Sequence, residues 1–250
     1  IKGNVEFKNV WLSYNENQFV LKDISFSLEK GESLAIVGAT GSGKSTIINA
    51  LCRFYEINKG DILFDGQSIK DINKFDLRKQ IALVQQDVFL FSGKIIDNIR
   101  LGNVQMREEE IQSISTAVNS HNFINKFPLK YEQELIEGGG SISSGQRQLL
   151  SFARALAVKP QILVLDEATS SVDMDTERQI KNGIKEMTRG RTSIIIAHRL
   201  STLMHVDKVL VLKNGKIIEF GKRNELLQQR GIFYKLCQAQ IKSEQFSAEQ

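Results

Sequence analysis

One short run of residues carries the clearest chemistry in the chain. Residues 38–46 read GATGSGKST and fit the phosphate-loop pattern G-x-x-x-x-G-K-[ST]. Glycines let the backbone turn tightly, so that successive N–H groups face one anion-sized hollow. In such a loop we expect Lys44 to reach the outer phosphates of a nucleoside triphosphate and Ser45 to offer its hydroxyl to Mg²⁺. The loop residues predicted to bind nucleotide are Gly38, Thr40, Gly41, Ser42, Gly43, Lys44, Ser45 and Thr46.

Two flanking segments must hold this loop in place. Residues 33–37 form an apolar run that predicts a buried strand, and residues 46–51 continue with a helical pattern. The N-terminus of that helix would add partial positive charge beside the phosphates. A chance match in a Gly/Ser-rich loop is the alternative, and the strand before and helix after the loop argue against it.

A second apolar run ends in two carboxylates. Residues 162–165 predict a buried strand, which leads directly into Asp166 and Glu167. The carboxyl end of such a strand lies beside the nucleotide crevice of an α/β sheet. Asp166 therefore suits a Mg²⁺ site, and Glu167 suits the group that polarises an attacking water. An exposed acidic turn is the alternative, which becomes hard to sustain once a phosphate loop precedes it.

The rest of the chain predicts an α/β architecture. Residues 94–158 have a mainly helical pattern, and the tail from Lys222 is helical and increasingly polar, with the last eight or so residues expected to be disordered. Asn214 and Gly215 predict a hairpin between residues 207–212 and 216–220. Further strand patterns lie at residues 5–12, 21–28, 61–66, 81–84 and 193–196.

Composition excludes several classes of protein. The 250 residues are 41% hydrophobic and 25% charged, with a net charge of +4, as in an ordinary globular protein. The chain has no dense run of Lys and Arg, so the sequence does not predict a nucleic-acid partner. No apolar run approaches the roughly 18 residues of a membrane span. Cys52 and Cys237 lie far apart, which favours reduced thiols of a cytosolic protein. The chain begins at Ile1 without Met or a signal peptide, which suggests a domain cut from a longer polypeptide.

The most specific motif lies between the loop and the carboxylates. Residues 142–148 read ISSGQRQ and are similar to the signature L-S-G-G-Q, followed by R-Q, of ABC (ATP-binding cassette) transporters, with Ile142 and Ser144 in place of Leu and Gly. Essentially the whole chain resembles the ATP-binding domain of this family. The resemblance implies a P-loop NTPase core with a mixed sheet flanked by helices, an N-terminal antiparallel β subdomain and a helical insert. We expect one domain, with its core at 1–86 and 159–250 and the helical subdomain at 87–158.

The same resemblance implies roles for individual residues. Tyr14 resembles the aromatic residue that stacks on adenine. The competing interpretation is an ordinary aromatic residue at the end of a strand. Stacking predicts that ATP binding depends on the ring face of Tyr14 and not on its hydroxyl. His198 resembles the switch histidine at the γ-phosphate, and Asp173 lies in the loop that meets the partner domain. Gln86 resembles the glutamine that contacts Mg²⁺ and the attacking water. Because Gln85 is adjacent, the sequence leaves open which of the two glutamines takes this role. The implied catalytic set is Lys44, Gln86, Glu167 and His198, the implied metal set is Ser45, Gln86 and Asp166, and the signature residues facing ATP are Ser143, Ser144, Gly145 and Gln146.

One segment narrows the subtype. Residues 87–99 look like the exporter segment that faces the intracellular helices of the membrane domain. Its apolar residues could instead be core, but the polar residues between them predict that some are exposed for docking. Glu134 and Glu137 resemble the exporter segment that touches the partner half. Ile136 and Gly138 depart from its usual pattern T-E-[VI]-G-E-x-G, which leaves the contacts there open.

These resemblances imply an ATP-hydrolysing domain of an exporter at the cytoplasmic face of the cell membrane. The implied partners are a transmembrane domain of the same transporter and a second ABC ATP-binding domain, joined head to tail as a homo- or heterodimer around ATP and Mg²⁺. A soluble ABC ATPase of DNA repair or translation is one rival, and the exporter-like segment argues against it. A non-enzymatic ATP switch is another, and Glu167 and His198 argue against it.

Overall fold

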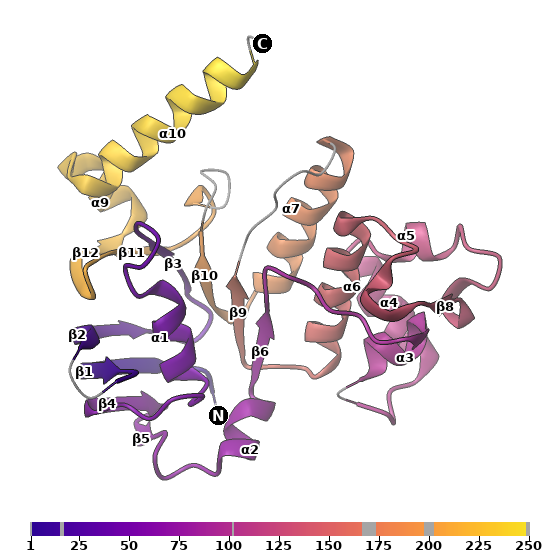
Figure 1. Ribbon diagram of the computed structural model, residues 1–250, viewed down its shortest axis with the longest axis horizontal. Helices are drawn as coiled ribbons and strands as arrows, with labels where there is room; N and C mark the ends of the chain where they lie inside the picture. Colours follow the sequence, from indigo (N-terminus) through magenta and orange to yellow (C-terminus); the bar gives the residue numbers. More distant parts are fainter. Residues whose placement is uncertain (1, 16–17, 102, 167–173, 198–202, 249–250) are drawn as a thin grey trace. The chain divides into compact units, whose positions relative to one another are not determined.

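The computed structural model describes residues 2–15, 18–101, 103–166, 174–197 and 203–248 (Figure 1). The chain divides into two compact units, one made of residues 1–78 and 190–250 and the other of residues 79–189. Within the described residues, no helix combines the length and the apolar character that crossing a membrane demands.

An antiparallel sheet opens the first unit. Its four strands follow the spatial order β2-β1-β4-β5. Alternating side chains of these strands are buried, and the rings of Phe7 and Phe26 stack with centroids 4.5 Å apart. This pattern is that of a sheet with one face on the core, as the period-two sequence predicts. The strands are β1 Val5–Ser13, β2 Phe19–Leu28, β4 Lys59–Phe64 and β5 Gln67–Ser68.

The same unit holds a second, mixed set of strands. β3 (Ser33–Val37) is buried along its whole length, and β10 (Thr192–Ile196) and β11 (Lys208–Lys213) pair with it in parallel on its two sides. β12 (Lys216–Lys222) pairs antiparallel with β11. The turn between them carries Asn214 and Gly215, so the predicted hairpin is confirmed.

Among the residues of this unit that the structure describes, the helices are α1, α2, α9 and α10. α1 (Lys44–Leu51) follows the phosphate loop, and α2 (Lys74–Lys79) ends at the boundary of the unit. α9 (Arg223–Gln229) and α10 (Ile232–Ala248) follow the hairpin, and Figure 1 shows α10 projecting from α9 away from β11 and β12. α10 extends to Ala248, and the expected disorder of the last eight or so residues stays a prediction.

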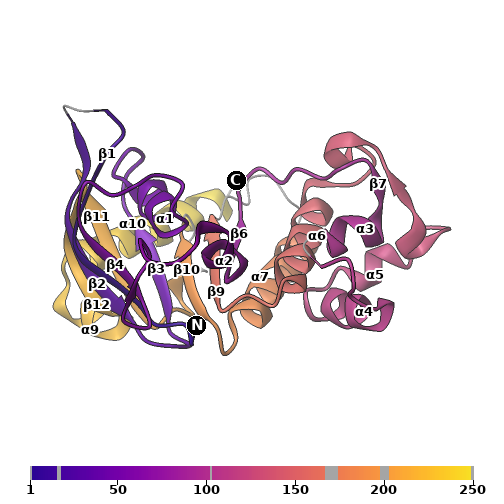
Figure 2. The same cartoon turned by 90° about the horizontal axis from the view of Figure 1, so that it is seen from below.

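The second unit combines two parallel strands with a group of helices. β6 (Ile81–Val84) pairs in parallel with β9 (Ile162–Asp166), and Figure 2 shows the helices of this unit gathered around α6. A short antiparallel pair, β7 (Gly93–Lys94) with β8 (Glu134–Leu135), interrupts the region that the sequence predicts as helical. The helices are α3 Ile95–Arg100, α4 Glu108–Ala117, α5 His121–Ile124, α6 Ser144–Ala157 and α7 Met174–Thr188, with short 3-10 turns at Lys130–Glu132 and Glu137–Gly139.

Candidate functional site

The phosphate loop connects the buried end of β3 to the start of α1. Gly43 caps α1 with φ of 107°, a left-handed conformation that favours glycine. Lys44 is the first residue of the helix, and its Nζ donates hydrogen bonds to the carbonyl oxygens of Gly38 at 2.8 Å and Ala39 at 3.1 Å. The loop therefore wraps around the ammonium group, which places a cation where the phosphates of a nucleotide would lie.

Two further features support the assignment of this loop to phosphate. A Cβ on Gly38 would lie 2.2 Å from the carbonyl oxygen of Leu212 and 2.8 Å from Oγ of Ser42, so only glycine can occupy this position. Within the described part of the chain, the buried hydroxyl of Ser42 has no hydrogen-bond partner. A close-fitting backbone and an unpartnered buried hydroxyl are features of a hollow built for a polar ligand.

The other described nucleotide-binding candidates of the first unit lie on this loop, on α1 and just after β1. Thr40 and Gly41 are exposed on the loop, Ser45 is exposed on the first turn of α1, and Thr46 is buried behind it. Tyr14 follows β1 with 41% of its surface exposed, and its hydroxyl donates to Oγ1 of Thr46 at 3.1 Å. The structure thus brings the predicted base-stacking ring and the predicted phosphate loop together.

The second unit holds the other candidates for Mg²⁺ and water. Val84 of β6 lies opposite Leu165 of β9, so these parallel strands end at one edge of their sheet. Gln86 is exposed two residues beyond β6, and Asp166 is the half-buried last residue of β9. Both are oxygen donors of the kind that Mg²⁺ binds. The candidates Glu167, Asp173 and His198 lie outside the described residues.

The signature residues form the start of α6. Oγ of Ser143 accepts from the backbone N–H of Gln146 at 3.2 Å, and Oε1 of Gln146 accepts from the N–H of Ser143 at 3.0 Å. This reciprocal capping box fixes the first turn of the helix. Ser144 is exposed at the first helical position, whereas Gly145 is buried. The arrangement presents a helix N-terminus, where an anion is stabilised by the partial charge of the helix.

The predicted exporter segment, residues 87–99, is fastened to α6 by an arginine. The guanidinium of Arg154 donates to the carbonyl oxygens of Phe89 and Asn98, both at 3.0 Å, and to Oδ1 of Asn98 at 2.9 Å. The amide of Asn98 in turn bonds the N–H of Phe91 at 3.0 Å and its carbonyl oxygen at 2.9 Å. Burial lowers the pKa of Arg154 from its usual value, although a guanidinium stays cationic at neutral pH.

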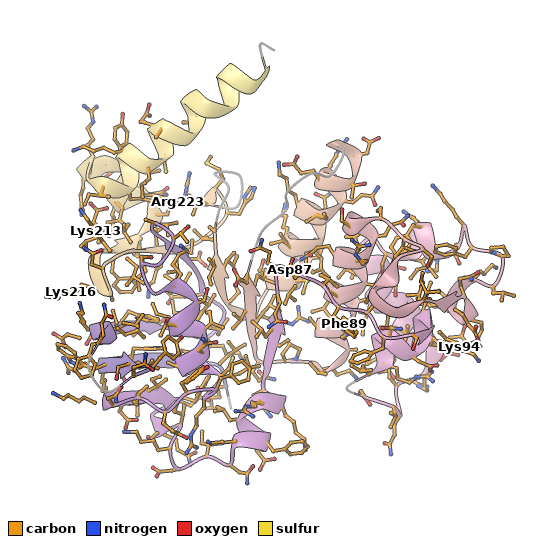
Figure 3. All side chains as sticks on the ribbon, in the orientation of Figure 1. Asp87, Phe89, Lys94, Lys213, Lys216 and Arg223 are labelled. Carbon is orange, nitrogen blue, oxygen red and sulfur yellow. The ribbon has the colours of Figure 1, made fainter. Side chains whose placement is uncertain are left out.

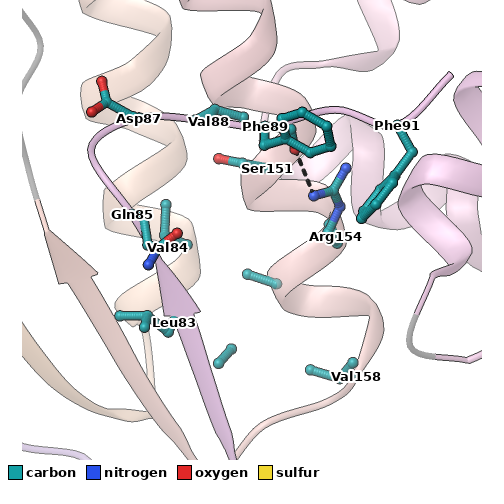
Figure 4. A pocket seen from close by; sticks show the side chains of 12 residues that line it. Leu83, Val84, Gln85, Asp87, Val88, Phe89, Phe91, Ser151, Arg154 and Val158 are labelled. Atoms are coloured by element: carbon teal, nitrogen blue, oxygen red, sulfur yellow. Dashed lines mark hydrogen bonds between the residues drawn. The ribbon is translucent and has the colours of Figure 1, made fainter. Parts of the chain in front are cut away.

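This framework presents two aromatic rings on the surface. Phe89 and Phe91 are 50% and 47% exposed, while Leu90 between them is fully buried. Their rings meet edge to face at 5.1 Å, and the Arg154 guanidinium lies 5.8 Å from the Phe91 ring (Figure 4). Asp87, Phe89 and Lys94, labelled in Figure 3, mark the course of the segment. The prediction that some of its apolar residues are exposed is confirmed.

A hollow of about 340 Å³ lies beside these rings. Figure 4 shows side chains of β6, of the exporter segment and of α6 around it. Ser151 and Arg154 of α6 and Val158 just after it line the hollow on one side. Leu83 of β6 and Val88 of the exporter segment line it on the other. The hollow belongs entirely to the second unit and offers an apolar recess rimmed by an arginine, which suits a protein side chain better than a phosphate.

Sequence reasoning missed three supporting residues. Arg154 and Asn98 hold the exporter segment, and Asn49 of α1 donates from Nδ2 to the hydroxyl of Tyr14 at 3.0 Å. Each has a partner at least 35 residues away in the sequence, so no local pattern predicts the contact. An arginine within the mainly apolar stretch of residues 149–157 was the one available signal.

The loop, the capped signature helix and the carboxylate-ended strand together define a nucleotide-binding domain of the P-loop class. A model of the ABC transporter family matches residues 21–170. Its relatives include two proteins of Bacillus subtilis that are described here. An uncharacterized ABC transporter ATP-binding protein, YfiC, is 44% identical over 96% of this chain and 40% of its own length. A probable multidrug resistance ABC transporter ATP-binding/permease protein, YheH, is 46% identical over 95% of this chain and 35% of its own length.

A solved structure extends the comparison to the fold. A bacterial Atm1-family ABC exporter with ATP bound superimposes with a TM-score of 0.88 at 36% identity, covering 96% of this chain and 42% of that one. The chain belongs to the ABC transporter family and is an ATP-binding domain of the kind that hydrolyses ATP. The predicted fold class is confirmed, and the chain spans less than half the length of these relatives.

Proposed function

We propose that this domain powers export of a substrate through a transmembrane domain at the cytoplasmic face of a cell membrane. The observation that carries the proposal is the exporter segment on α6, where Arg154 and Asn98 hold two exposed phenylalanines beside a 340 Å³ hollow. Exposed aromatic side chains on a rigid support are typical anchors of a protein interface. The relative named for multidrug resistance and the solved Atm1-family exporter support the same proposal.

Phosphoryl transfer depends mainly on positioning and on stabilisation of charge. Lys44 supplies a cation held inside the phosphate loop, 2.8 Å from the Gly38 carbonyl oxygen. Ser45, Asp166 and Gln86 are the residues that would hold Mg²⁺, which when bound neutralises phosphate charge. Glu167 is assigned to polarising the attacking water and His198 to the γ-phosphate.

A second ATP-binding domain completes the proposed site. The exposed N-terminus of α6, at Ser143 and Ser144, would face the phosphates of a nucleotide held by the partner domain, and Gly145, Gln146 and Asp173 would contribute there. The support is the capping box, which leaves the first helical turn ordered and open to an anion. In the dimer, the negative phosphates of each ATP would lie between the phosphate loop of one domain and the helix N-terminus of the other. Without nucleotide this negative charge is missing, so we infer an ATP-dependent head-to-tail dimer.

The test uses Glu167→Gln in the full-length transporter in proteoliposomes. We expect ATP binding to persist, while hydrolysis slows at least about a hundredfold and transport stops, as for loss of a positioned base. Glu186→Gln, on an exposed part of α7, is the matched control and should keep full activity.

Different results would favour the rivals. Near-normal turnover of Glu167→Gln would remove Glu167 from its role. Hydrolysis by the unmodified protein that responds to nucleic acid and not to a membrane domain would indicate a soluble ABC ATPase. Nucleotide binding without any turnover would indicate a non-enzymatic switch.

A further inference from the structure

The hydroxyl of Tyr14 is tied to α1 by two hydrogen bonds. It donates to Oγ1 of Thr46 at 3.1 Å and accepts from Nδ2 of Asn49 at 3.0 Å. Thr46 and Asn49 lie three residues apart, so they sit on the same face of the helix. A tyrosine beyond the end of β1 is thereby attached to the helix that begins with Lys44 of the phosphate loop.

A second aromatic ring packs against the ring of Tyr14. The rings of Tyr14 and Tyr55 have centroids 4.6 Å apart and planes at 83°, an edge-to-face arrangement. Both rings are partly exposed, at 41% and 49%. The ring of Tyr14 is thus held at its hydroxyl and by an aromatic neighbour, while much of its surface stays open to a ligand.

We propose that Asn49 is a positioning residue for the nucleotide base, which sets the ring of Tyr14 before ATP arrives. The inference rests on the proposed stacking of the base on Tyr14. An untethered tyrosine would have to give up side-chain rotations on binding, whereas a ring already fixed avoids that cost. Because Thr46 belongs to the phosphate loop, the tether also sets the distance between the base platform and the phosphate site.

This arrangement changes what the sequence alone predicts for Tyr14. Stacking by itself requires only the ring face, so phenylalanine should be as good as tyrosine. The two hydrogen bonds at the hydroxyl instead predict that Tyr14→Phe weakens ATP binding by about two- to tenfold, the usual effect of one lost side-chain hydrogen bond.

The test measures equilibrium binding of ATP and of tripolyphosphate, which lacks a base, to the full-length protein. Asn49→Ala removes the donor but keeps the backbone bond from Phe54 N–H to the Asn49 carbonyl oxygen, 2.9 Å long. We expect Asn49→Ala and Tyr14→Phe each to weaken ATP about two- to tenfold, with tripolyphosphate affinity unchanged. The double variant should be no weaker than the worse single variant, because both remove one network. Asn125→Ala, an exposed asparagine bonded to His121 in the other unit, is the control and should change neither affinity.

Three results would overturn the proposal. Unchanged ATP affinity in Asn49→Ala would show that the tether does not serve binding. Equal losses for ATP and tripolyphosphate would show that Asn49 acts on the phosphate loop or the fold. Additive losses in the double variant would show that the two side chains act separately. Tyr14→Ala separates this inference from the proposed stacking, because unchanged ATP affinity there would refute the stacking role itself.

Discussion

The backbone N–H of Gly215 donates a hydrogen bond to the carbonyl oxygen of Ser42 at 3.0 Å. The turn of the β11–β12 hairpin is thereby fastened to the phosphate loop. The carbonyl oxygen of Gly215 also accepts from the N–H of Lys22 at 2.8 Å, which joins the turn to β2. A Cβ at Gly215 would lie 2.0 Å from the carbonyl oxygen of Val20. The C-terminal hairpin therefore acts as a support of the loop.

Gly215→Ala should loosen this support. Its φ of 77° already disfavours alanine, and the collision with Val20 adds a cost of about 1–3 kcal/mol, typical of overpacking. We expect lower thermal stability and weaker ATP binding. Gly31→Ala is the matched control, because Gly31 has φ of 83° but no atom within 4 Å of an added Cβ. Equal effects of the two substitutions would show that backbone strain alone, without the collision with Val20, accounts for the effect of Gly215→Ala.

Local signals predicted much of the fold. The hairpin at Asn214 and Gly215 was predictable because two consecutive residues with positive φ favour these residue types, and they have φ of 51° and 77°. The buried strand β3 and the glycine-rich loop were predictable because their patterns are continuous in sequence. The β7–β8 pair was not, since two-residue strands carry no measurable alternation.

Contacts between distant segments could not be predicted from local patterns. Gly38 matches the phosphate-loop motif, but its need to avoid the Leu212 carbonyl oxygen depends on how β11 lies beside β3. The partners of the Tyr14 hydroxyl likewise depend on the path of the chain after β1. The roles given to Glu167 and His198 stay predictions.

Lys44→Ala should weaken ATP binding by at least about tenfold. The variant removes the ammonium that the loop carbonyl oxygens hold at 2.8 and 3.1 Å, and charge-assisted contacts to phosphate are among the stronger hydrogen bonds. Titration with ATP measures the loss, and circular dichroism checks that the fold is kept. ATP affinity equal to that of the unmodified protein would contradict the assignment of residues 38–46 as the phosphate site.

Phe89→Ala should uncouple hydrolysis from transport in the full-length protein. The ring is 50% exposed beside the hollow on α6, so its loss removes contact area from the proposed interface and leaves the phosphate loop untouched. We expect normal ATP affinity with transport reduced severalfold. Phe75→Ala, at an even more exposed phenylalanine of α2, is the control. Unimpaired transport by Phe89→Ala, or an equal loss in both variants, would count against the interface.

Asp65 should make the free energy of unfolding of the first unit fall at acidic pH. Partial burial alone would raise the pKa of this carboxyl, but the backbone N–H groups of Asn4, Lys2 and Gly3 and the Asn4 side chain hold the pKa below its usual value. The bonds therefore stabilise the fold above the unfolded pKa of about 3.9 and are lost as pH falls through the lower folded pKa. In urea unfolding, we expect Asp65→Asn to be less stable than the unmodified protein at pH 7, with the difference vanishing at strongly acidic pH. Asp71→Asn is the control, and a pH-independent difference for Asp65→Asn would contradict the prediction.

Ser144 marks the clearest departure from the family signature. It is exposed at the first position of α6, where the signature usually has glycine and a bare backbone can approach phosphate closely. The added Cβ and hydroxyl would stand between the helix N-terminus and a nucleotide held by a partner domain. Two unequal sites in a heterodimer would follow if the partner supplied an unaltered signature, whereas a homodimer would have to accommodate serine in both sites.

Ser144→Gly should therefore raise the basal ATPase of the full-length protein expressed alone by severalfold, because the helix N-terminus can then reach the phosphates. Ser141→Gly, an exposed serine just before the signature, is the control and should have no such effect. A strong requirement for a second gene product, relieved in part by Ser144→Gly, would support the heterodimer with unequal sites. Robust activity of the unmodified chain alone, unchanged by Ser144→Gly, would instead show that serine at the start of α6 leaves the approach to phosphate open and that two copies of this chain suffice.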